Sequence, residues 1–123
     1  MLRVARESII VGDPSWSLMT DVHPIFAEIE ALLDDSTPRR VDEIEDTLTS
    51  GYAAALALEA ERWRIERRIS DTAAELASSD GEASGAQELA GLAHRLKGND
   101  ADLTRLRGML ESLRDRADAA RAA

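Results

Sequence analysis

The residues best suited to chemistry are His94, Lys97 and Gly98, in a stretch that reads AHRLKG from residue 93. On a helix, residues three apart lie on the same side, so His94 and Lys97 are neighbours. A solvent-exposed imidazole beside an ammonium is suited to reversible phosphorylation, because the ammonium can hold the charge of the phosphoryl group. Without that reaction, His94 is an ordinary polar residue on a solvated helix face.

This stretch resembles the phosphoacceptor sequence of histidine-phosphotransfer domains, in which His-x-Leu-Lys-Gly lies within a helix of an all-helical bundle. The resemblance implies that His94 would accept the phosphoryl group, Lys97 would help to hold it and Gly98 would let a response regulator approach. After Gly98 the sequence departs from the family, because Asp100 and Asp102 add negative charge near the incoming phosphate. A histidine-phosphotransfer-like phosphorelay module is therefore the alternative function.

Four arginines around Trp63 form the main basic cluster: Arg62, Arg64, Arg67 and Arg68. Basic residues interleaved with an aromatic ring can bind single-stranded nucleic acid. Three glutamates are interspersed and nearly cancel the local charge: Glu59, Glu61 and Glu66. The cluster therefore favours a salt-bridged helix face.

The sequence lacks the motifs of common enzymes. His23 and His94 are its only histidines, and it has no cysteine, phosphate-binding loop or dinucleotide-binding glycine pattern. We expect no cofactor, no metal site and no enzymatic activity.

The composition favours protein partners over nucleic acids and membranes. The net charge is −9 at pH 7, whereas duplex nucleic acids and anionic membranes attract basic surfaces. The acidity is concentrated near the N-terminus, where residues 1–38 contain two arginines and seven acids. No segment approaches the roughly 20 apolar residues of a membrane span. We therefore expect a cytoplasmic protein that presents its acidic N-terminal part to a protein partner.

Three helices are predicted after an N-terminal arm of residues 1–20, so that residues 21–123 form one domain. The first runs from about Asp21, a plausible N-cap, to Asp35, with Pro24 in its first turn. The second starts at Pro38, and residues 77–85 form the loop before the third. The second and third carry apolar residues at alternating spacings of three and four, which is a heptad pattern. These features predict an all-α fold: a long antiparallel, coiled-coil-like helical hairpin with a short helix packed on it, completing a three-helix bundle.

The heptads also predict the register of the hairpin. Folding about the loop places Leu58 near Leu106 and Ile65 near Asn99. It brings together two pairs of opposite charge, Glu45 with Arg121 and Glu59 with Arg107. Arg62 and Asn99 interrupt the apolar row and form a polar layer, which favours one register at some cost in stability. Contact of this layer with another chain or an anion is the alternative.

A second apolar stripe, formed by Tyr52, Leu56 and Trp63, flanks the heptad row. Soluble monomers seldom leave such a stripe exposed. We expect either that the first helix covers it or that two copies of the chain meet there as a homodimer. The arm carries further apolar residues that could dock on a partner, namely Trp16, Leu18 and Met19. The sequence therefore predicts a non-enzymatic interaction or regulatory adaptor protein.

Overall fold

The structure is a computed structural model that describes residues 21–34, 40–78 and 83–122. These residues form three helices, α2 (His23–Leu33), α3 (Val41–Ser78) and α4 (Ala83–Ala122). No strand occurs in the described ranges. The predicted all-α three-helix architecture is confirmed.

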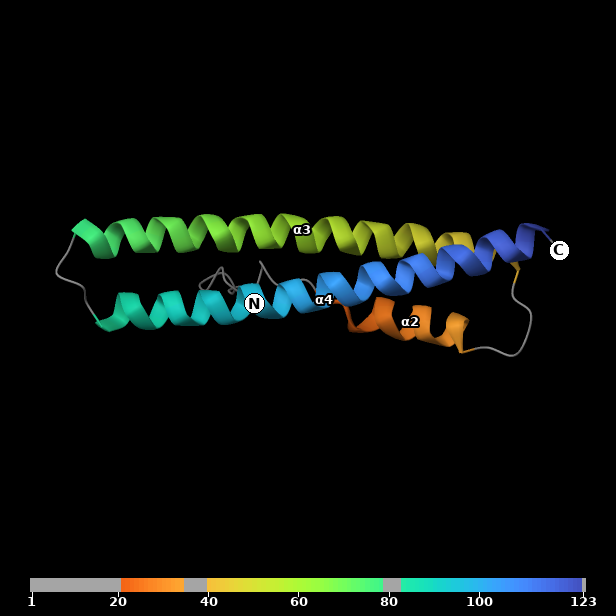
Figure 1. Cartoon of the computed structure of the whole chain (residues 1–123), viewed down its shortest axis with the longest axis horizontal. Coiled ribbons are helices and arrows are strands. Elements are labelled where there is room, and N and C mark those ends of the chain that lie inside the picture. Colours follow the sequence, from red (N-terminus) through yellow and green to blue (C-terminus); the bar gives the residue numbers. More distant parts are fainter. Residues whose placement is uncertain (1–20, 35–39, 79–82, 123) are drawn as a thin grey trace, which may run out of the picture.

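The two long helices lie side by side in opposite directions along their whole length, and α2 lies against only half of them (Figure 1). That half is the one farther from the α3–α4 connection. The chain thus has a three-helix part and a two-helix stem.

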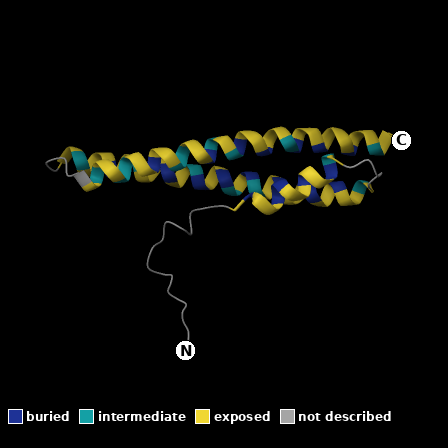
Figure 2. Ribbon diagram, turned by 90° about the horizontal axis from the view of Figure 1, so that it is seen from below, coloured by how far each residue is buried: buried dark blue, intermediate teal, exposed yellow. Residues whose placement is uncertain are grey.

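The hydrophobic core lies in the three-helix part, and Figure 2 shows buried residues concentrated there. Leucines of α4 at heptad spacing, such as Leu106 and Leu113, are fully buried, as are Ile29 of α2 and Leu58 of α3. Burying each such side chain contributes about 1.5–3 kcal/mol, so this layer is the main source of stability. The core cluster comprises Val22, Ile25, Phe26, Ile29, Leu32, Ile44, Leu48, Ala55, Leu58, Leu103, Leu106, Leu110, Leu113 and Ala117.

Helix α2 packs on a different side of α3 from the one we expected. It approaches Gly51, where an added Cβ would lie 3.7 Å from Ile29 Cδ1, and it does not cover the stripe of Tyr52, Leu56 and Trp63. Gly51 has no side chain, so Ile29 of α2 and Leu110 of α4 can both approach α3 closely at this point. The prediction that α2 covers the stripe is therefore wrong.

Two arginines of α4 hold α2 in place. Arg116 donates hydrogen bonds to the carbonyl oxygens of Leu32 and Leu33, which satisfies acceptors left free at a helix end. Arg105 pairs with Glu30 at 2.8 Å, and its guanidinium lies 4.2 Å from the centroid of the Phe26 ring. A helix of 11 residues is marginal alone, so these contacts and the core side chains determine that it forms.

The helix ends differ from the prediction in two places. The N-cap residue of α2 is Val22, without a side-chain cap, whereas Asp21 accepts a hydrogen bond from His23 N. That bond and a second one from the His23 ring lower the pKa of Asp21. The hairpin connection is also shorter than expected, because α3 continues to Ser78 and α4 begins at Ala83. The proposed start of the second helix at Pro38 lies outside the described residues.

Two predicted charge pairs between α3 and α4 are present, although the closest contacts lie about one turn from the predicted register: Gly51 lies against Leu110, and Asn99 bonds to the carbonyl oxygen of Leu58, beside which the prediction placed Leu106. Arg121 pairs with Glu45, and Arg107 pairs with Glu59, which confirms both expectations. The contact with Glu45 raises the pKa of Arg121. These pairs are about half exposed, so they select the register more than they add stability.

Candidate functional site

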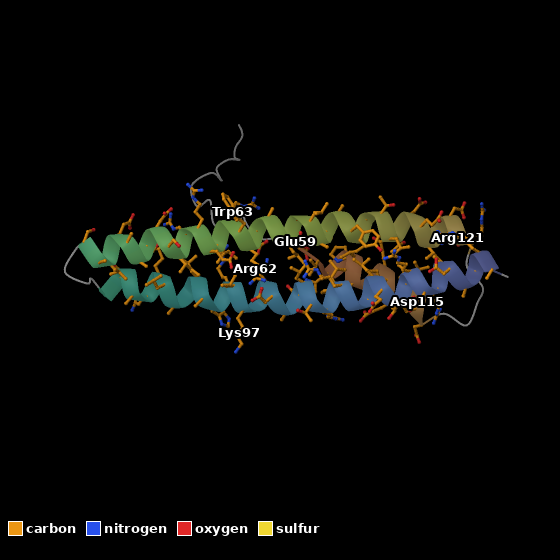
Figure 3. The ribbon with its side chains drawn as sticks, turned by 45° about the horizontal axis from the view of Figure 1, so that its top comes forward. Glu59, Arg62, Trp63, Lys97, Asp115 and Arg121 are labelled. Atoms are coloured by element: carbon orange, nitrogen blue, oxygen red, sulfur yellow. The ribbon has the colours of Figure 1, made fainter. Side chains whose placement is uncertain are left out.

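Three groups of residues are candidates for function. They are the polar layer in the middle of the hairpin, the surface around His94 and the outer face of α3. Figure 3 shows that Glu59 and Arg62 lie toward α4, whereas Trp63 projects from the outer side of α3 and Lys97 from the opposite, outer side of α4.

The polar layer lies next to the three-helix core. Asn99 is 4% exposed, and its amide donates a 3.0 Å hydrogen bond to the carbonyl oxygen of Leu58. Arg62 is less buried: Nη1 lies 2.8 Å from Asp100 Oδ1, and Nε lies 3.4 Å from Glu66 Oε2. Arg62 therefore balances two acids at the edge of the layer.

The buried α3 residue at this level is Glu61, which is 7% exposed, while Arg62 is partly exposed. The sequence analysis places Arg62 in the heptad row; the row residues on either side, Leu58 and Ile65, are buried, so the difference is confined to this level. Among the described residues, Asn99 Oδ1 and Arg95 Nη2 are buried without a hydrogen-bond partner. Polar groups so arranged restrict the hairpin to one register and reduce its stability.

The surface around His94 is open. His94, Lys97 and Gly98 are all exposed, and an added Cβ on Gly98 would meet nothing within 4 Å. Asp100 is turned toward Arg62 of α3, so at least one of the two acids has its own counter-charge. The geometry gives His94 no hydrogen-bond partner among the described residues that would orient its ring. Phosphotransfer through His94 stays a prediction.

The outer face of α3 carries the largest exposed apolar side chains in the described ranges. Tyr52 is 43% exposed, Leu56 67% and Trp63 59%. The guanidinium of Arg67 lies 5.3 Å from the centroid of the Trp63 ring. Such a row of large apolar side chains is typical of a surface that binds another protein.

A groove between α3 and α4 adjoins Tyr52 and Leu56. Its floor is apolar, and Gly108 leaves room at its α4 side, because an added Cβ there would meet nothing within 4 Å. The charges along it are balanced, with two arginines and two glutamates, which does not favour a nucleic acid. The lining residues are Tyr52, Ala55, Leu56, Glu59, Arg107, Gly108, Leu110, Glu111 and Arg114. Sequence reasoning identified Tyr52 and Leu56 but missed the α4 wall, because no periodic signal marks a glycine that opens a groove.

The three candidate partner-binding residues of the N-terminal arm, Trp16, Leu18 and Met19, lie outside the described residues. Within the described ranges, no group of three or more His, Asp or Glu residues could hold a metal ion. No described helix is both long and apolar enough to cross a bilayer.

Comparisons with known proteins add no family to these observations: no family model, no curated protein and no solved structure matches this chain.

Proposed function

We propose that this chain is a non-enzymatic protein-interaction module whose docking surface is the outer face of α3. The observation that supports the proposal is the row of Tyr52, Leu56 and Trp63, which stays exposed although the core of the same helix is well packed. Exposed rows of this kind lower the solubility of a monomer, and a partner that buries them removes that cost.

The shape of the surface favours a helical partner. Leu56 borders the groove between α3 and α4, so protruding apolar side chains of α3 lie next to a groove that can receive side chains of a partner. A partner helix can place its own apolar residues in such a groove at intervals of three and four. The acidic N-terminal part of the chain, with Trp16, Leu18 and Met19, supplies a second proposed contact.

Affinity capture tests the proposal. The full chain is immobilised, proteins of the native host are captured and identified, and a captured protein is then purified and titrated. The double variant Leu56→Ser, Trp63→Ser should lose most of the binding while keeping its helical circular dichroism. The matched control is His94→Ser, Lys97→Ser, which changes two exposed residues on the outer side of α4. Unchanged binding by the α3 variant would contradict the proposal.

The same preparation tests the alternative. Under the phosphorelay hypothesis, incubation with a small phosphodonor should give an acid-labile phosphate on the wild-type chain and none on His94→Ala. We expect no such adduct on either protein.

A further inference from the structure

The exposed row on α3 continues beyond its apolar centre as a second heptad pattern, which we call the outer stripe. Its residues follow one another at alternating spacings of four and three, and every one is exposed. They are Asp42, Asp46, Thr49, Ala53, Leu56, Ala60, Trp63 and Arg67. Four successive members, Ala53, Leu56, Ala60 and Trp63, are apolar, and apolar residues at this spacing on an exposed face are typical of a helix that packs against a second helix.

The outer stripe has opposite charges at its two ends. Asp42 and Asp46 lie at its start, and Arg67 lies at its end with the exposed Arg64 beside it. The centre between them is small or apolar. An identical stripe running in the opposite direction would therefore place acids against arginines at both ends. An identical stripe in the same direction would place like charges together, which is unfavourable.

From this complementarity we infer that the occupant of the outer stripe is a second copy of this chain, with the two α3 helices antiparallel. The inference rests on the proposed function, because it names the partner of the same surface. The two-fold axis passes between residues 54 and 55. Across it, Asp42 faces Arg67 and Ala53 faces Leu56 of the second copy, while Asp46 faces Trp63 and lies next to Arg64.

The charges of α3 are divided in a way that fits this arrangement. Those on its α4 side are used within the chain, as in the pairs of Glu45 with Arg121, Glu59 with Arg107 and Arg68 with Glu88. Asp46 and Arg64 form no ion pair with any described residue.

The remaining two charged residues of the stripe have only local contacts. Asp42 pairs with Arg40, where both side chains are largely exposed, and Arg67 lies over the Trp63 ring. Both can therefore turn to a second copy at little cost.

The small residues of the stripe allow close approach. Thr49 faces Ala60 of the second copy, and Ala53 faces Leu56. At the centre, Leu56 thus meets a small residue, which is how knobs enter holes between packed helices. The interface is isologous, so each contact occurs twice.

Sedimentation equilibrium of the full chain tests the inference. At tens of micromolar, low salt should give twice the mass of the chain, and higher salt should weaken the association because the end pairs are exposed. Arg64→Asp should weaken it about tenfold, since it turns two symmetric attractions into repulsions. Asp46→Arg should do the same, and the exchange variant Asp46→Arg, Arg64→Asp should restore association.

Matched controls lie on the outer side of α4. Lys97→Glu changes the net charge by the same amount as Arg64→Asp, and Asp115→Arg matches Asp46→Arg. Lys97 and Asp115 are exposed, and Figure 3 shows both on the side away from α3. Neither control should change the association. If the controls weaken it as much as the stripe variants do, the inferred interface is wrong.

Cross-linking determines the direction of the helices. The chain has no cysteine, so Asp42→Cys and Arg67→Cys each introduce one thiol. In an antiparallel dimer, mild oxidation of a mixture should join position 42 to position 67, and each variant alone should cross-link poorly. Efficient cross-linking of each variant alone would show parallel helices and overturn the inference.

A monomer at all concentrations would also overturn it. If that monomer shields Trp63 from iodide in a Trp16→Phe background, and deletion of residues 1–20 exposes Trp63, the occupant is the chain's own N-terminal segment. If the chain is monomeric and the stripe variants still lose binding to a captured protein, the dimer is refuted and the proposed function is retained. A dimer that the stripe variants leave intact would overturn the inference, because the two copies would then meet through another surface.

Discussion

Alanine substitutions at Gly51 and Gly98 are expected to change stability in opposite directions. Both glycines lie inside long helices, Gly51 in α3 and Gly98 in α4. In the interior of a helix, replacing glycine with alanine gains about 1 kcal/mol, because alanine restricts the unfolded chain and favours helical backbone angles. The two sites therefore share this term and differ only in what the new methyl group meets.

At Gly98 the methyl group would have no neighbour within 4 Å, so Gly98→Ala should stabilise the chain by roughly 0.5–1 kcal/mol. At Gly51 it would lie 2.3 Å from Leu110 Cδ2, and Leu110 is 3% exposed within the core. Overpacking of a core costs about 1–3 kcal/mol. Gly51→Ala should therefore destabilise the chain by up to about 2 kcal/mol.

Thermal unfolding followed by circular dichroism at one protein concentration measures the difference. A change of 1 kcal/mol corresponds to a shift of about 4 °C in the unfolding midpoint for a chain of this size. The double variant Gly51→Ala, Leu110→Ala should be more stable than the sum of the single effects predicts, because removal of Leu110 Cδ2 removes the clash. Equal stabilisation by both glycine changes would refute the reasoning, since Leu110 would then move aside without cost.

Three further changes test other parts of the structure. Arg116→Ala should lower stability by roughly 1–2 kcal/mol, because two carbonyl oxygens at the end of α2 lose a charged donor; Arg116→Lys should recover part of it, and unchanged unfolding curves for Arg116→Ala would show that water replaces the donor. Asn99→Leu should raise the unfolding midpoint, because it removes a buried oxygen without a described partner while Leu58 keeps its bond within the helix; a lower midpoint would show that the Asn99 bond is needed. His94→Ala should change stability by less than about 0.5 kcal/mol, as exposed substitutions do; a larger loss by the same unfolding assay would reveal a structural role.

The hairpin could be predicted from sequence because one signal dominated it. Apolar residues at heptad spacing extend over both long segments, and a pattern of that length has few competing interpretations. Opposite charges at matching positions, such as Glu45 with Arg121, supported the antiparallel pairing of the two helices independently. Agreement between two signals of different physical origin made the prediction strong.

The polar layer was harder to predict, because the spacing of apolar residues does not show which of two adjacent charged residues turns inward. At this level Glu61 is buried instead of Arg62, while the predicted row positions on either side, Leu58 and Ile65, are buried as expected. Arg62 is long enough to reach Asp100 and Glu66 from the side, so its type alone did not reveal its position.

The position of α2 depends on where α3 leaves room for another helix. The spacing of apolar residues does not indicate this. We expected α2 to cover Tyr52, Leu56 and Trp63 because a soluble monomer seldom leaves such a stripe exposed. The large residues of α2, such as Ile29, instead pack on the side that has Gly51. A helix can approach more closely where its neighbour carries a glycine than where it carries large side chains. By the same argument, the outer face of α3 suits a partner with small residues between its large ones, and the outer stripe, with Ala53 next to Leu56 and Ala60 next to Trp63, has this alternation itself.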